Sequence, residues 1–174
     1  RSSCAERMRQ RSERRVKVTI RAAHPEDGKA ISRLIREELD VPVSAADITH
    51  ALANLCVNPR HRIFAASIDG VLVGFLHLCD YDSLLLHVPM KLVLSMAVGG
   101  SYRRVGIGTA LLKRAERHAA ESGAGGIRLD APAQFDDGAK AFFAHCGYTA
   151  EPQTRYEKLF EDTKGGYENG LLIL

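Results

Sequence analysis

The sequence predicts a single α/β domain with a mixed central sheet of about six to seven strands flanked by about four helices. Three observations support this fold class. Strand-like apolar segments alternate with helical patterns, Asp69-Gly70 separates two strand-like runs, and a glycine-rich turn joins an apolar segment to an amphipathic helix. The chain has 174 residues, which suits one domain with a sizeable core. We expect that domain to span residues 16–160, between a flexible basic arm (1–15) and a flexible tail (161–174).

The first part of the domain reads as a strand followed by two helices. Val16 to Arg21 alternates apolar and polar residues, which is typical of a half-buried strand. Apolar residues then recur at helical spacing from Pro25 to Leu39, and a proline suits the first helical turn. Ser44 and Asp47 resemble a capping box, so we expect a second helix to begin there and to end before Pro59.

A β-hairpin comes after the two helices. Residues 62–68 and 71–78 read as strands on either side of Asp69-Gly70, a dipeptide that favours a two-residue turn because both positions accept positive φ. The next apolar stretch, residues 84–88, either prolongs the second strand of the hairpin or forms a loop over the core. Pro89 separates this stretch from the apolar run that begins at Lys91.

The second half of the domain is built around a glycine-rich turn. Lys91 to Val98 is a nearly continuous apolar run, which predicts a central strand buried on both faces. The turn, Gly99 to Gly108, leads into an amphipathic helix, Thr109 to Glu121, that ends at Gly123. Three elements remain. We expect a strand at Ile127–Ala131, parallel to its predecessor, then a helix from Asp136 or Asp137 to Gly147, and a last strand at Arg155–Phe160.

The glycine-rich turn has the chemistry of an anion site. A helix that begins directly after a strand and a turn leaves its first backbone amides unpaired, with the positive end of the helix dipole behind them. Gly106 and Gly108 allow the backbone to approach a ligand closely. Arg103 and Arg104 add two guanidinium groups that can form charge-assisted hydrogen bonds with phosphate oxygens.

Composition argues against several other functions. The net charge is only +3, and the arginines concentrate in the first 21 residues without aromatic residues among them, so we expect a solvated arm and no nucleic-acid partner. The cysteines Cys4, Cys56, Cys79 and Cys146 are scattered, and the seven histidines lack metal-ligand spacing, so we expect no disulfide framework and no metal. No apolar run reaches the ~20 residues of a membrane span. With no secretory h-region visible either, we expect a cytoplasmic protein that does not enter a membrane.

Two segments resemble a known family. Arg103-Arg104-Val105-Gly106-Ile107-Gly108 fits the pattern R-x-x-G-x-G, and it lies between an apolar strand and a helix. This arrangement resembles the acyl-CoA site of the GNAT superfamily of N-acetyltransferases. Ala139 to Tyr148 is similar to the family's segment of the form N-x-x-A-x-x-F-Y-x-x-x-G-F. With the order of elements, the likeness covers about residues 16 to 160.

The resemblance implies an enzyme that moves an acetyl group from acetyl-CoA directly to a primary amine. The diphosphate is expected on the amides from Arg104 through Thr109, with the pantetheine arm beside the preceding strand and the thioester near a backbone donor at Val98. The amine is expected to enter a splay between that strand and the next parallel one. The residues that the resemblance assigns to the coenzyme are Met96, Ala97, Val98, Arg103, Arg104, Val105, Gly106, Gly108, Thr109, Asp136 and Phe143.

The catalytic groups are harder to assign, because the chain departs from the family pattern. Phe143 stands where many members carry a tyrosine that acts as general acid, and Asp136 stands where the family often has asparagine. Residues 91–98 contain no carboxylate that could serve as a base. The candidates that remain are His77, Tyr81 and Asp82, although each of them also has an ordinary structural explanation.

A rival interpretation is a non-catalytic acyl-CoA-binding or interaction module, which Phe143 and the lack of carboxylates in residues 91–98 favour. If the protein is an enzyme, the sequence leaves three acceptors open, which are a small amine, a peptide N-terminus and a protein lysine. A cationic amine is favoured if the acidic cluster borders the cleft; its members are Glu37, Glu38, Asp40, Asp80 and Asp82. A homodimer through the last strand or the apolar end, Leu171–Leu174, is a further expectation.

Overall fold

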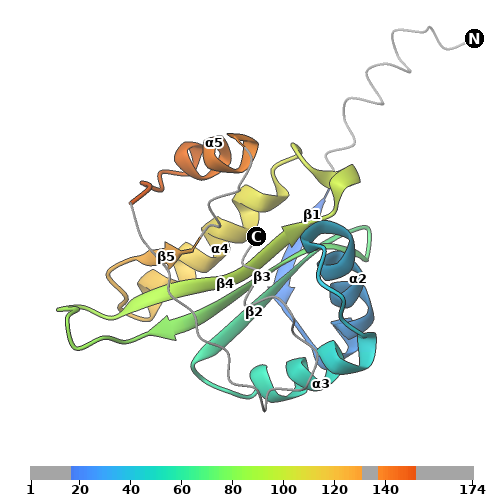
Figure 1. Ribbon diagram of the computed structural model, residues 1–174, viewed down its shortest axis with the longest axis horizontal. Helices are drawn as coiled ribbons and strands as arrows, with labels where there is room; N and C mark the ends of the chain where they lie inside the picture. Colours follow the sequence, from blue (N-terminus) through green and yellow to red (C-terminus); the bar gives the residue numbers. More distant parts are fainter. Residues whose placement is uncertain (1–16, 131–136, 152–174) are drawn as a thin grey trace, which may run out of the picture.

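The computed structural model describes residues 17–130 and 137–151, which form one mixed sheet with helices on both faces (Figure 1). The strands are β1 (Val18–Ala22), β2 (His61–Ile68), β3 (Val71–Tyr81), β4 (Met90–Val98) and β5 (Ile127–Leu129). The helices are α2 (Gly28–Leu39), α3 (Ala45–Leu55), α4 (Ile107–Glu121) and α5 (Asp137–His145), with two short 3-10 turns, η1 (Pro25–Asp27) and η2 (Gly100–Tyr102). The predicted α/β class and the four helices are confirmed.

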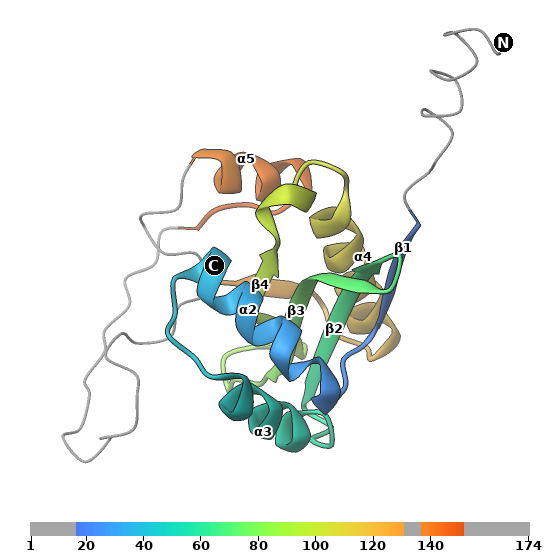
Figure 2. The ribbon, with the colours of Figure 1, turned by 90° about the vertical axis from the view of Figure 1, so that its right-hand side faces the viewer.

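The strands lie in the order β1-β2-β3-β4-β5, and neighbours are antiparallel except for the parallel pair β4 and β5. Helices α2 and α3 cover one face of the sheet, and α4 covers the other (Figure 2). Each face has its own core: Ile31, Leu34 and Phe75 belong to the first, and Leu76, Ile107 and Leu111 belong to the second. The parallel crossover predicted through the helix after the glycine-rich turn is therefore present.

The structure has five strands in its described residues, not six to seven. Residues 84–88 form a loop, in which Leu86 donates to the Ser83 carbonyl and Leu85 donates to the Ser83 hydroxyl. Leu84 and Leu85 are 105% and 88% exposed, and no strand among the described residues pairs with this stretch. Several predicted segments lie outside the described residues. They are the strand expected at Arg155–Phe160, the end of the strand expected at Ile127–Ala131, and the arm and tail proposed at 1–15 and 161–174.

Local turn and cap chemistry agrees with the sequence. Asp69 and Gly70 have φ values of 48° and 81°, as the predicted two-residue hairpin turn requires. Ser44 caps α3 by accepting a hydrogen bond of 3.0 Å from the Asp47 amide. Helix α4 begins at Ile107, two residues earlier than predicted, because Gly106 with its positive φ is the residue that precedes it.

Strand β4 is not buried on both faces as its apolar run suggests. Lys91, Val93 and Ala97 are buried, whereas the residues between them are only half-buried. Pairing with β5 covers only Lys91, Leu92 and Val93, so in the described part of the chain the rest of β4 has an open edge. A β-bulge at Leu94, which has no partner in β3, lies where that opening starts. The splay predicted between the two parallel strands would begin at this point, but residues 131–136, which follow β5, lie outside the described part of the chain.

Helices α2 and α3 pack closely at Gly28. A Cβ at this position would lie 2.0 Å from the Thr49 hydroxyl oxygen and 2.8 Å from the Thr49 Cα. We therefore expect Gly28→Ala to lower the free energy of unfolding by about 1–3 kcal/mol, although glycine to alanine within a helix is usually stabilising. Urea denaturation measures this change, with Lys29→Ala on the exposed side of α2 as control. An unchanged or higher midpoint for Gly28→Ala would contradict the close packing.

Candidate functional site

The segment between β4 and α4 presents a row of unpaired amides. Gly99 donates to the Val73 carbonyl and η2 makes one tight turn, after which Arg104 and Gly106 take positive φ values of 62° and 88°. In the described part of the chain, no amide from Arg104 to Thr109 donates a hydrogen bond. These amides meet at the N-terminus of α4, where the helix dipole favours a negative charge. The turn can therefore bind an anion through its backbone.

The two motif glycines serve different purposes. A Cβ on Gly106 would have no heavy atom of residues 17–130 or 137–151 within 4 Å, so these residues leave the space in front of it open to a ligand. A Cβ on Gly108 would lie 3.0 Å from the Phe142 ring and 3.2 Å from the Met96 methyl. Gly108 thus allows α5 and β4 to pack against the first turn of α4. Sequence reasoning assigned both glycines to the coenzyme and missed this packing role.

The two motif arginines also differ. Arg104 and Val105 are exposed beside the unpaired amides. The Arg103 guanidinium instead donates to Glu38 of α2 at 2.5 Å, and its Nε lies 3.4 Å from the Val98 carbonyl. Arg104 is therefore the arginine of this turn whose side chain makes no polar contact with the described residues.

The open edge of β4 carries further donors. Successive amides of a strand point to opposite edges. Because Gly99 donates to β3, the amides of Val98 and Met96 face away from β3, toward the edge that β5 leaves open. Ala97 between them is buried and pairs with Phe75. The predicted residues Met96, Ala97, Val98, Gly106 and Thr109 are thus brought together along one continuous stretch of backbone.

Helix α5 closes one side of this region with aromatic rings. Phe143 lies 5.1 Å from the Phe142 ring and 6.1 Å from the Tyr148 ring, measured between ring centroids. The Tyr148 hydroxyl donates to Glu116 at 3.2 Å, and burial together with this carboxylate raises the pKa of Tyr148. Tyr148 is accordingly a packing residue that holds its proton. Asp136, predicted to bind the coenzyme, lies outside the described residues.

His77 is the candidate base that lies closest along the sheet to the open part of β4. It pairs with Ser95, next to the bulge and to Met96. Its Nε2 is 2.9 Å from Nδ1 of His61 on β2, so one ring donates and the other accepts. Burial, with a smaller contribution from His61, lowers the pKa of His77 to about 4. His77 is therefore neutral at pH 7.

This shifted pKa predicts a pH dependence of stability. Between pH 6.5 and about 4, His77 binds more protons in the unfolded chain than in the folded one, so stability falls as the pH is lowered through this window. The slope is at most ~1.4 kcal/mol per pH unit. Burial also lowers the pKa of His118, so the test compares wild type with His77→Asn at pH 7.5 and pH 5. We expect a smaller loss in the variant; equal losses would contradict the assignment.

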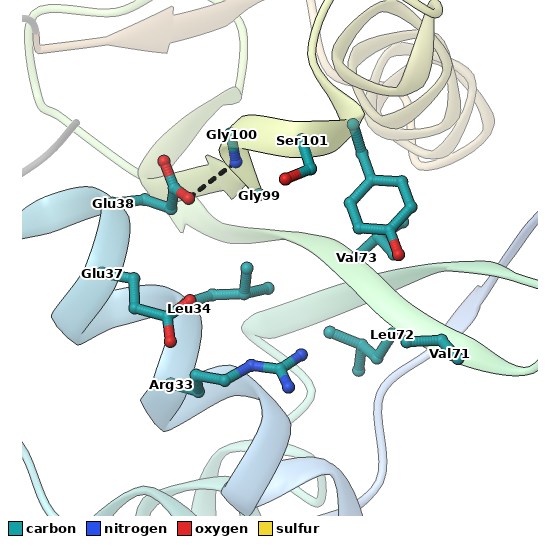
Figure 3. A pocket seen from close by; sticks show the side chains of 11 residues that line it. Arg33, Leu34, Glu37, Glu38, Val71, Leu72, Val73, Gly99, Gly100 and Ser101 are labelled. Carbon is teal, nitrogen blue, oxygen red and sulfur yellow. Dashed lines mark hydrogen bonds between the residues drawn. The ribbon is translucent and has the colours of Figure 1, made fainter.

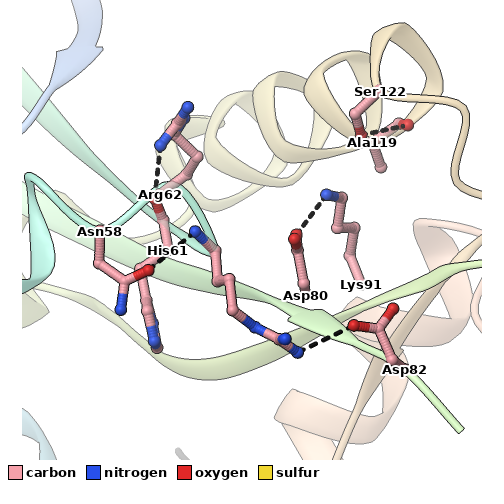
Figure 4. Close-up of polar contacts among 9 residues, drawn as sticks. Asn58, His61, Arg62, Asp80, Asp82, Lys91, Ala119 and Ser122 are labelled. Carbon is pink, nitrogen blue, oxygen red and sulfur yellow. Dashed lines mark hydrogen bonds and ion pairs between the residues drawn. The ribbon is translucent and has the colours of Figure 1, made fainter.

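Tyr81 and Asp82 lie elsewhere. Tyr81 pairs with Met90, about 25 Å along the strand from Val98. Asp82 forms an exposed ion pair with Arg60 at 2.9 Å, and Asp80 pairs with Lys91 at 2.5 Å (Figure 4). Both aspartates are therefore engaged at the far end of β4.

A hollow of about 350 Å³ lies behind η2, between α2 and the start of β3 (Figure 3). Its lining is mixed, with Arg33 and Glu37 from α2, Leu72 and Val73 from β3, and Tyr102 from η2.

The described residues show neither a metal centre nor a membrane span. Residues 17–130 and 137–151 contain no group of three or more side chains that could hold a metal ion together. None of the helices in these ranges is long and apolar enough to cross a bilayer.

Comparison with known proteins decides the family. The model of the Acetyltransferase (GNAT) family matches residues 29–148, which is more than half of the chain. The chain belongs to the GNAT acetyltransferase family. The predicted recognition and the predicted enzyme class, an acetyltransferase, are confirmed, and the family as a whole uses acetyl-CoA. No curated protein matches the sequence.

Solved structures show how widely this fold is shared. A ribosomal-protein-alanine N-acetyltransferase from Brucella melitensis is 23% identical with a TM-score of 0.66, and the match covers 82% of this GNAT chain and 99% of that one. An aminoglycoside acetyltransferase from an uncultured soil metagenomic sample is 21% identical with a TM-score of 0.67, over 82% and 95% of the two chains. A transcriptional regulator from Bacillus halodurans is 20% identical with a TM-score of 0.72, over 82% and 100%. At these identities the likeness concerns the fold.

Proposed function

We propose that this GNAT protein transfers an acetyl group from acetyl-CoA to a primary amine by direct attack of the amine on the thioester. The observation that carries the proposal is the row of unpaired amides from Arg104 to Thr109 beside the exposed Arg104. Such a row suits a diphosphate, because it supplies several donors, a helix dipole and a cation without a large side chain in the way.

The open edge of β4 suits the remainder of the coenzyme. The Met96 and Val98 amides face this edge and can pair with the amide groups of the pantetheine arm as a neighbouring strand does. Whichever of these two amides faces the thioester carbonyl can also stabilise the negative charge that develops on the carbonyl oxygen during the reaction. Met96, Phe142 and Phe143 supply apolar surface in the same region, where Met96 and Phe142 both approach Gly108.

Direct transfer fits the chemistry of Cys56 and Cys79 better than an acyl-cysteine route does. Burial raises the pKa of the Cys56 and Cys79 thiols, so both are poor nucleophiles at neutral pH. The amine must lose a proton before it attacks. His77, which pairs with Ser95 beside the bulge of β4, is our candidate to receive that proton, and because its pKa is lowered to about 4 it is a weak base that must pass the proton on. Phe143 has no proton to donate, so in this proposal the thiolate leaves without help from the position that is often tyrosine in the family.

The acceptor we propose is a cationic small amine. Glu37 and Asp40 are exposed at the C-terminal end of α2 and make no ion pair among the described residues, so they can attract a positively charged substrate. An aminoglycoside acetyltransferase is among the proteins of similar fold, and aminoglycosides are small polyamines. We further propose a cytoplasmic location, since Cys56, Cys79 and Cys146 are all free thiols. A homodimer also remains our proposal.

The experiment that tests the function incubates the protein with acetyl-CoA and a panel of amines. The panel contains aminoglycosides, linear polyamines, a peptide with a free N-terminus and an N-terminally blocked peptide with one lysine. Mass spectrometry of the acetylated amine is the readout, because the chain's own thiols disturb assays of released coenzyme. We expect acetylation of at least one polyamine or aminoglycoside. Binding of coenzyme without acetylation of any amine would instead favour the non-catalytic acyl-CoA-binding module.

A further inference from the structure

Glu38 ties helix α2 to the segment that carries the unpaired amides. One of its carboxylate oxygens accepts a hydrogen bond of 2.7 Å from the Gly100 amide, and the other accepts one of 2.5 Å from the Arg103 guanidinium. The Glu38 side chain is only 14% exposed, so this ion pair is partly shielded from water. We propose that Glu38 is a positioning residue for the coenzyme, which acts by locking the turn in its anion-binding shape. This inference rests on the proposed function.

Packing does not hold η2 in place from behind. The hollow of about 350 Å³ lies between η2 and α2, and Figure 3 shows Glu38 reaching Gly100 at its edge. Among the atoms of the described residues, a Cβ placed on Gly100 would meet only the two Glu38 oxygens, at 3.6 and 3.9 Å. In a well-packed core, neighbouring side chains would fix such a turn. Here the two bonds to Glu38 take over that task.

The contacts on either side of η2 explain which part of the turn Glu38 holds in place. Gly99 is fixed to β3 through Val73, and Glu38 fixes the next residue, Gly100, and then Arg103. Arg104, with its positive φ, comes immediately after and begins the row of free amides. Holding both sides of η2 therefore sets the direction in which these amides point. A turn that is ordered in advance loses less conformational entropy when the ligand binds.

The same pair changes the role of Arg103. Its guanidinium is neutralised by Glu38 instead of facing the ligand, so Arg104 and the amides are left to bind the phosphates. Arg103 then acts through the shape of the turn, as Glu38 does. The R-x-x-G-x-G motif of this chain thus contains an arginine that works by pairing with a carboxylate 65 residues earlier.

A double-mutant cycle tests the proposal. The variants are Glu38→Ala, Arg103→Gln and the combination of the two, and calorimetry measures the dissociation constant of coenzyme A. We expect each single change to weaken binding about tenfold and the double change to add little more, because both break one unit. Glu38→Gln keeps an oxygen for the Gly100 amide and should recover part of the loss. Glu26→Gln, in η1 at the opposite end of α2, changes an exposed glutamate that makes no polar contact among the described residues, and it should bind as wild type does.

A second ligand separates positioning of the turn from a general loss of structure. Pantetheine lacks the diphosphate, so ligand-observed NMR should find its binding unchanged in every variant. The proposal is overturned if pantetheine binding falls as much as coenzyme binding, if Glu38→Ala binds coenzyme A as wild type does, or if the two single losses add in full. Melting curves of each variant verify that it is folded, and Glu38→Gln provides the milder change if Glu38→Ala is not. Failure of the wild type to bind coenzyme A would instead refute the proposed function.

Discussion

Acetyl-CoA at about 100 times its dissociation constant is expected to stabilise the folded chain by roughly 2.7 kcal/mol. For a chain of this size that corresponds to a rise in melting temperature of roughly 5–10 °C. The physical reason is that the ligand binds only where the folded turn brings the amides of Arg104 to Thr109 together. Thermal unfolding monitored by circular dichroism at increasing ligand concentration measures the effect.

Two related ligands serve as controls for this shift in melting temperature. Coenzyme A should give a shift close to that of acetyl-CoA, because both carry the diphosphate that the turn is proposed to hold. Pantetheine at the same concentration should give a much smaller one. An unchanged melting temperature at millimolar acetyl-CoA would argue strongly against a coenzyme site anywhere on the chain.

The second large effect is expected from Gly106→Val. Gly106 has a φ of 88° and open space around it, so a valine both strains the backbone and projects into the region proposed for the diphosphate. We expect coenzyme affinity to fall at least 100-fold, and the free energy of unfolding to fall by about 1–3 kcal/mol from the strain. Calorimetry and urea denaturation provide the two readouts.

Gly123→Val is the matched control for this variant. Gly123 lies just beyond the other end of α4, has a φ of 75° and likewise has no heavy atom within 4 Å of its would-be Cβ. The same substitution there should cost similar stability and leave coenzyme affinity as in wild type. If both variants lost affinity equally, the loss at Gly106 would come from strain in α4, and Gly106 would not face the ligand.

The sequence was most informative where the chain's local chemistry decides the structure. Asp69-Gly70 requires a turn with positive φ, Ser44 caps the helix that begins after it, and the motif around Gly106 marks the strand, turn and helix of the proposed coenzyme site. Each of these signals lies within a few residues, so no tertiary contact is needed to interpret it. The GNAT family itself was recognised from two such segments and is confirmed by the family match.

Features that depend on distant residues were not predictable in this way. The sequence shows an acidic cluster near Glu38, but nothing in it indicates that Glu38 reaches Gly100 and Arg103 across more than 60 residues. The pairing of His61 with His77 likewise depends on the register between β2 and β3. For residues 84–88 the sequence left a strand and a loop open, and the structure shows the loop, since apolar residues alone do not make a strand where the described residues offer no neighbouring strand.

A crystal structure of the chain with bound coenzyme A tests the central claim most directly. The account predicts diphosphate oxygens within hydrogen-bond distance of several amides between Arg104 and Thr109, with the pantetheine arm along the open edge at Met96 and Val98. A coenzyme bound elsewhere, with those amides facing only solvent, would contradict it.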